Sequence, residues 1–155
     1  MARGKKLLYY RLFQIAGLVC YYFPFVTLGT FGSEEEETAT GLESMTAIFF
    51  RMDLERDPVN WYLFWSFIFG IAAVVFLYQA RKDHRKALYA GYSACGGCAL
   101  LFLFRTTFLS YYGMSRNALS LLGIYLKFRF GWWIALLGFL AAGVGAITIY
   151  RNPEG

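Results

Sequence analysis

The sequence predicts a membrane protein that is mainly α-helical: a bundle of four transmembrane helices with a small extracytoplasmic β-sheet as a cap. Hydrophobic residues make up 58% of the 155-residue chain, whereas soluble globular domains average about 45–50%. Charged residues amount to only 16%, and long apolar stretches separate their clusters. Tyrosine and tryptophan flank these stretches, as they do at membrane–water interfaces. The chain is therefore expected to form one membrane domain.

Four apolar stretches are long enough to cross a lipid bilayer. A transmembrane helix needs about 20 mostly apolar residues, and the predicted spans cover residues of about 5–23, 58–80, 86–105 and 131–150. Pro24 ends the first span, because proline cannot donate the hydrogen bond that would continue a helix.

Clusters of basic residues predict the orientation of the bundle through the positive-inside rule. They comprise Arg3, Lys5, Lys6 and Arg11 near the amino end, Arg81, Lys82, Arg85 and Lys86 in the middle turn, and Arg151 near the carboxyl end. The first loop is acidic and is therefore placed outside. We expect a multi-pass protein of the inner cell membrane with both termini in the cytoplasm.

The outer cap is predicted from two segments of opposite charge, residues 25–57 and 106–130. The first holds eight acidic and two basic side chains, whereas the second, together with Arg105, holds four basic and no acidic ones. Both lie on the same side of the predicted bundle, so we expect them to pack together. Alternating apolar residues predict strands at 48–54 and 123–130, and β-forming residues predict another at 25–31.

The acidic run Glu34, Glu35, Glu36 and Glu37 could bind a divalent cation through carboxylate oxygens. It is equally the composition of a solvated turn, and Ser33 with Glu36 fits a capping box that begins a short helix. His84 is the only histidine and lies outside every predicted span. This excludes paired-histidine ligation of haem within the membrane, and we predict neither a metal centre nor a cofactor.

The pair Cys95 and Cys98 suggests one alternative function, a membrane thiol oxidoreductase that passes electrons to quinone. The pair lies near the middle of a span, where a thiol forms little of the reactive thiolate. Only Cys20 is available as a further cysteine, so there is no second pair to relay electrons. We therefore predict no catalytic residue.

Small residues form a face on each of the last two predicted spans, and small residues allow close approach between helices. They are Gly91, Ala94 and Gly97 on the third span and Gly138, Ala142 and Gly145 on the fourth. These faces predict helix packing and binding to other membrane proteins.

A small transporter or channel component is the second alternative. Ionisable and polar groups inside spans are costly and usually functional. The spans contain few of them: Gln14, Ser66, Ser93 and Thr148. The basic residues flank apolar spans and form no stripe with interleaved aromatic rings, so nucleic acid is not an expected partner. The leading hypothesis is a non-catalytic accessory or structural subunit, whose partners are the lipid bilayer and other membrane proteins in a hetero-complex or homo-oligomer.

The predicted layout resembles that of claudins, with four spans, a long first outer loop, a short cytoplasmic turn and a strand that leads into the last span. The claudin loop signature of a tryptophan, Gly-Leu-Trp and two cysteines does not occur, so the resemblance is one of layout. Short segments also resemble small uncharacterised four-span proteins of bacteria, a family that implies no activity. They are Phe23-Pro24-Phe25, Thr40-Gly41-Leu42-Glu43, Phe130-Gly131-Trp132-Trp133 and Leu136-Leu137-Gly138-Phe139.

Overall fold

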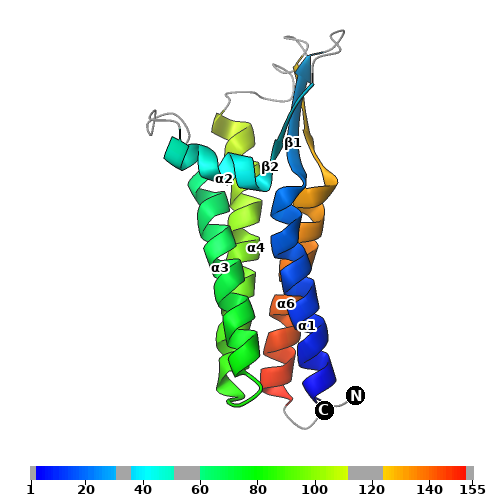
Figure 1. The fold of residues 1–155 in the computed structure, drawn as a ribbon, viewed down its shortest axis with the longest axis vertical. Coiled ribbons are helices and arrows are strands. Elements are labelled where there is room, and N and C mark those ends of the chain that lie inside the picture. The colour runs from blue at the N-terminus through cyan, green and yellow to red at the C-terminus, as the bar shows by residue number, and fades with distance from the viewer. Residues whose placement is uncertain (1–2, 31–35, 51–59, 112–123, 153–155) are drawn as a thin grey trace.

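The computed structural model describes residues 3–30, 36–50, 60–111 and 124–152. Four long helices run side by side, and a sheet with one short helix lies at one end of them (Figure 1). In chain order the elements are α1 (Arg3–Val19), the 3-10 turn η1 (Cys20–Tyr22), β1 (Pro24–Thr30), β2 (Glu36–Thr40), α2 (Gly41–Phe50), α3 (Asn60–Gln79), α4 (Arg85–Tyr111), β3 (Ile124–Phe128) and α6 (Phe130–Arg151).

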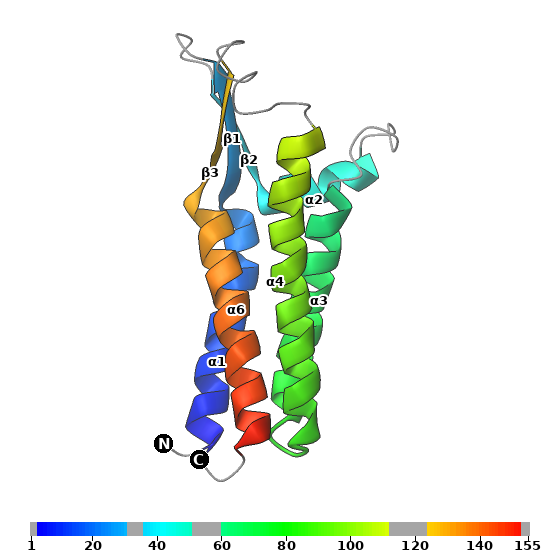
Figure 2. The same ribbon diagram turned by 180° about the vertical axis from the view of Figure 1, so that it is seen from behind.

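The two ends of the bundle differ in character. Helix α1 begins, α6 ends and the α3–α4 turn lies at one end, while the sheet and α2 occupy the other (Figures 1 and 2). The predicted grouping of the basic segments at one end and the sheet at the opposite end agrees with this arrangement.

Three helices are long and apolar enough to cross a membrane. Their candidate spans are Trp61–Gln79, Arg85–Thr107 and Phe130–Arg151. Helix α1 has 17 residues, slightly short of the length expected for a complete span, although η1 continues the chain in helical turns to Tyr22. The composition and these helices identify a mainly α-helical membrane protein.

The sheet has three strands in the order β2-β1-β3, and both neighbours run antiparallel to β1. The strands predicted at 25–31 and 123–130 correspond to β1 and β3, with Val26 opposite Phe128. On the other side of β1, Thr27 lies opposite Thr38, and their hydroxyl oxygens are 3.0 Å apart. The pairing of β1 with β3 joins the segments that lead out of α1 and into α6.

The strand predicted at 48–54 is wrong, because Ile48, Phe49 and Phe50 belong to helix α2 and the remaining residues lie outside the described part. The third strand is β2, which contains Glu36. Glu36 therefore does not lie in the first turn of a helix, as the alternative of a capping box with Ser33 would require, and Ser33 itself lies outside the described residues. The box forms instead at the start of α2. The Thr40 amide donates to Glu43 Oε2 at 2.8 Å, and the Glu43 amide donates to Thr40 Oγ1 at 3.1 Å. This reciprocal pair of hydrogen bonds begins a helix. The helix continues through residues 48–50, although their alternation of side chains predicted a strand.

A first prediction concerns pH and the start of α2. Hydrogen bonds from the Thr40 amide and hydroxyl lower the pKa of the exposed Glu43 carboxyl. A carboxylate whose pKa is lower in the folded state stabilises that state fully above its unfolded pKa, and the stabilisation disappears as the pH falls through the folded value. The protection factors of the α2 amides, in which each exchange rate is compared with the intrinsic rate at the same pH, should therefore fall below about pH 4. Glu43→Gln keeps an acceptor for the box but should remove the pH dependence, and an unchanged profile in this variant would refute the assignment.

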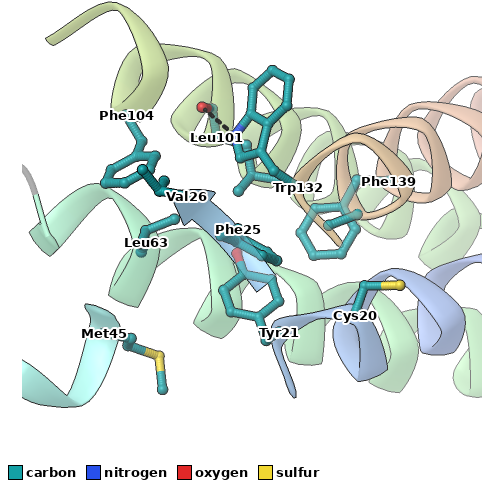
Figure 3. Close-up of a cluster of buried hydrophobic side chains, with 11 residues drawn as sticks. Cys20, Tyr21, Phe25, Val26, Met45, Leu63, Leu101, Phe104, Trp132 and Phe139 are labelled. Atoms are coloured by element: carbon teal, nitrogen blue, oxygen red, sulfur yellow. Dashed lines mark hydrogen bonds between the residues drawn. The ribbon is translucent and has the colours of Figure 1, made fainter. Parts of the chain in front are cut away.

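The largest hydrophobic cluster lies where the sheet meets the bundle. It contains Tyr21, Phe25, Trp132 and Phe139, which are completely buried. Figure 3 shows these rings converging from η1, β1 and α6, with the Trp132 indole donating to the Leu101 carbonyl of α4 at 3.3 Å. Burying a large side chain stabilises the fold by about 1.5–3 kcal/mol. The cluster therefore anchors the sheet to the four long helices.

Candidate functional site

The polar side chains inside the bundle connect its helices to one another. Between η1 and α3, the Tyr21 hydroxyl donates to Ser66 Oγ at 2.9 Å, and Ser66 donates to the Gly97 carbonyl of α4 at 2.8 Å. Tyr21 and Ser66 have no exposed surface. Three helical segments are thus joined by one buried chain of hydrogen bonds, which satisfies polar groups that would be costly in an apolar interior.

Helix α1 makes two further polar contacts with α3. The Arg11 guanidinium donates to the Leu77 carbonyl at 2.9 and 3.2 Å and lies 4.3 Å from the centre of the Tyr78 ring. Leu77 is in the last turn of α3, where carbonyl groups lack helical partners and a positive charge complements the helix dipole. The sequence placed Arg11 among the flanking charges, but its longer-range role is to cap α3.

Gln14 makes the other contact, donating from Nε2 to the Gly70 carbonyl at 3.4 Å. The side chain is completely buried, and its Oε1 has no hydrogen-bond partner in the described structure. Thr106 and Thr148 are exposed, but their hydroxyls donate to carbonyls of their own helices. Such back-bonding allows a hydroxyl to face lipid. These polar groups therefore do not gather into one site.

The six small residues singled out in the sequence lie inside the bundle, against other helices of the same chain. Ala94 and Ala142 pack together with Ala73. An added methyl group at Gly91 would meet Ile147, one at Gly97 would meet Phe139, one at Gly138 would meet the Phe13 carbonyl, and one at Gly145 would meet Tyr10. Their observed role is packing within this chain, and a partner would have to contact a different surface.

The thiols of Cys95 and Cys98 are both free and partly buried. The Cys98 thiol donates a hydrogen bond to the Leu136 carbonyl, with the two heavy atoms 3.8 Å apart. The Cys95 Sγ lies close to Gly143. Both side chains therefore contact α6. Cys20 is buried in the cluster at the end of α1, separate from this pair.

The acidic run is only partly visible. Glu36 and Glu37 lie on β2, opposite Gly29 and Leu28, whereas Glu34 and Glu35 lie outside the described residues. Within the described ranges no group of three or more His, Cys, Asp or Glu side chains could hold a metal ion. His84 is exposed in the α3–α4 turn and stacks with Tyr150, with ring centres 6.0 Å apart.

The geometry also identifies a cation that the sequence analysis treated only as part of the cap's charge balance. Arg105, near the end of α4, lies against three aromatic rings. Its guanidinium carbon is 5.5 Å from the centre of Phe128, 5.4 Å from Trp132 and 5.2 Å from Trp133. The close spacing of these rings after residue 127 was visible in the sequence, but their partner on α4 was not.

A second prediction concerns the buried hydrogen-bond chain. Tyr21→Phe and Ser66→Ala should each lower the free energy of unfolding by about 0.5–1.5 kcal/mol, the range typical of interhelical hydrogen bonds in membranes. Because both changes interrupt the same chain, the double variant should lose less than the sum of the single losses. Reversible unfolding in mixed detergent micelles would measure the free energies of unfolding of the wild-type chain, the two single variants and the double variant. Additive losses would show that the two hydroxyls act independently.

No protein-family model matches this chain, and a search of curated proteins finds no similar sequence. The class established by sequence and fold together is a mainly helical membrane protein with three candidate spanning helices.

Proposed function

We propose that the chain is a non-catalytic, four-span subunit of the inner cell membrane that binds other integral membrane proteins. The observation that carries this proposal is the use of the polar side chains within the bundle. Tyr21, Ser66 and Arg11 all hold its helices together, as expected for a scaffold. A transporter would instead be expected to direct polar groups toward a shared pathway.

The fourth span in this proposal is α1 with η1. Seventeen helical residues extend about 26 Å, and η1 adds a further turn. Arg11 and Gln14 contact α3 near its end and its middle, so α1 runs along α3 within the bundle. Both termini are placed in the cytoplasm together with the basic α3–α4 turn, following the positive-inside rule.

Topology reporters test the span count separately from the partner. A reporter fused after Gly155 should give a cytoplasmic signal, and one inserted within residues 34–37 should give an extracytoplasmic signal. These two sites differ whether or not α1 crosses, because α3, α4 and α6 lie between them. A reporter fused before Met1 is therefore compared as well, and it should give a cytoplasmic signal. The same signal before Met1 and within residues 34–37 would refute the four-span topology. It would not decide whether the protein binds a partner.

We place the partner contact on α3, because its own chain covers it less than it covers α4 or α6. In the apolar stretch of the candidate span of α3, 28% of the residues are buried within the protein, compared with 44% in those of α4 and α6. Trp61, Trp65, Ile68 and Val75 recur at helical spacing along one side and are all exposed. Large side chains on one helix pack well against small residues on another, so the expected partner is a transmembrane helix with a small-residue face.

Purification from native membranes in mild detergent tests this function. We expect a companion membrane protein in a fixed ratio. A photoreactive residue at Ile68 of α3 should crosslink to it, whereas one at Val144 of α6, which is also exposed, should crosslink much less. A chain that purifies without a companion and forms no crosslink at Ile68 would refute the subunit proposal.

A further inference from the structure

The spacing of Arg105 and Lys86 along α4 matches the thickness of the hydrocarbon core of a bilayer. At the helical rise of about 1.5 Å per residue, it is about 28 Å along α4 from Lys86. The hydrocarbon core of a bilayer is about 30 Å thick. Both residues belong to the same candidate span, Arg85–Thr107. If Lys86 lies at one surface of the hydrocarbon, Arg105 lies at the other, on the side of the sheet.

Among the described residues, the surroundings of Arg105 hold its charge in place but leave its hydrogen-bond donors unused. Phe128, Trp132 and Trp133 surround the guanidinium at 5.2–5.5 Å, and cation–π contacts of this kind are favourable. The faces of the rings accept none of the five N–H donors in the usual way. Within the described residues, no oxygen atom accepts a hydrogen bond from Arg105 and no carboxylate pairs with it.

The aromatic cradle opens toward the outer surface of the bundle. Trp133 is 43% exposed, while the neighbouring Trp132 is completely buried and donates to the Leu101 carbonyl. Phe102, one turn before Arg105 on α4, is also exposed. The guanidinium thus lies between a fixed inner ring and an outer ring that faces lipid. A ligand would reach it from the membrane.

Phosphate is the acceptor that fits this arrangement. A half-buried cation is stabilised when its donors are satisfied, and the planar guanidinium fork binds two phosphate oxygens at once. The phosphodiester groups of glycerophospholipids are abundant at this depth. We propose that Arg105, held by Phe128, Trp132 and Trp133, binds the phosphate of a glycerophospholipid in the leaflet on the side of the sheet. This inference does not depend on the proposed partner protein.

The test uses the full-length chain in detergent and measures its melting temperature during titration with phosphatidylglycerol. Ligands that bind only the folded state raise that temperature. The wild-type chain should be stabilised, and Arg105→Gln should bind the lipid about tenfold more weakly, the loss expected for one charge-assisted pair. Arg81→Gln is the matched control, because Arg81 is an exposed cation in the α3–α4 turn; it should retain wild-type affinity.

Two further measurements separate the possible outcomes. Arg105→Lys keeps the charge but not the fork, so it should bind the lipid several-fold more weakly than wild type; this variant decides the question if Arg105→Gln does not fold. Inorganic phosphate at matched concentration should stabilise the wild-type chain much less. Wild-type lipid affinity in the Arg105 variants, or equal stabilisation by inorganic phosphate, would overturn the proposed lipid site.

Discussion

Phe128→Asp is expected to detach the sheet from the helical bundle. Phe128 ends β3, lies opposite Val26 of β1 and packs against the buried cluster. Its ring centre is 5.2 Å from that of Trp132 and 6.4 Å from that of Phe104. A carboxylate at this position would lose the ring contacts and place a charge beside apolar rings. Attraction to the Arg105 guanidinium, which lies 5.5 Å from the centre of the Phe128 ring, would offset only part of that cost. We expect a loss of about 2–4 kcal/mol in the free energy of unfolding.

Limited proteolysis from the side of the sheet would measure this change. The Phe128→Asp chain should be cleaved rapidly between residues 24 and 40 while the bundle remains intact. Two controls should stay protected: Phe128→Leu keeps an apolar side chain, and Lys127→Gln leaves the main-chain pairing of β3 with β1 in place. Equal protection of all three variants would show that Phe128 does not anchor the sheet.

Gly138→Ala should produce the second large effect, by separating α1 from α6. A methyl group at Gly138 would lie 2.8 Å from the Phe13 carbonyl oxygen and 3.3 Å from the Gly17 Cα. Both are main-chain atoms, so relief requires a whole helix to shift. Overpacking of this kind costs about 1–3 kcal/mol, in spite of the better helix propensity of alanine.

Gly96→Ala provides a matched control on a neighbouring helix. There the nearest atom to an added methyl group is Phe69 Cδ1 at 3.5 Å, an ordinary contact. The substitution should leave stability unchanged or raise it by as much as about 1 kcal/mol through helix propensity. Melting temperatures in detergent would compare the two variants. A Gly96→Ala chain as unstable as Gly138→Ala would show that close α1–α6 packing is not the cause.

Local sequence patterns were sufficient to predict the helices that lie in an apolar environment along their whole length. The apolar stretches correspond to α3, α4 and α6, because lipid requires an uninterrupted apolar helix with its main-chain hydrogen bonds satisfied internally. Strands β1 and β3 were also predicted, by β-forming residues and by alternation. Residues 48–50 were misassigned because their alternation resembles a strand, whereas the capping box formed by Thr40 and Glu43 begins a helix several residues earlier.

The small-residue faces illustrate the limit of a one-dimensional pattern. Gly138 and Gly145 were correctly expected to allow close helix contact, but a periodic face does not reveal whether the contacting helix belongs to the same chain. The structure places Phe13 and Tyr10 of α1 against them. These contacts fill the surface that had been expected to bind a partner.

Composition alone indicates that this chain is a membrane protein, and the distribution of charge suggests at which end of the helical bundle the sheet lies. Both follow from the sequence because the transfer of a segment between lipid and water depends on each residue and its near neighbours. The interactions that define its sites depend on pairs far apart in the chain. Tyr21 meets Ser66 across 45 positions, and Arg105 meets rings that belong to β3 and α6. Only tertiary packing decides such pairs, since a helix presents several faces and its neighbours select which one is buried.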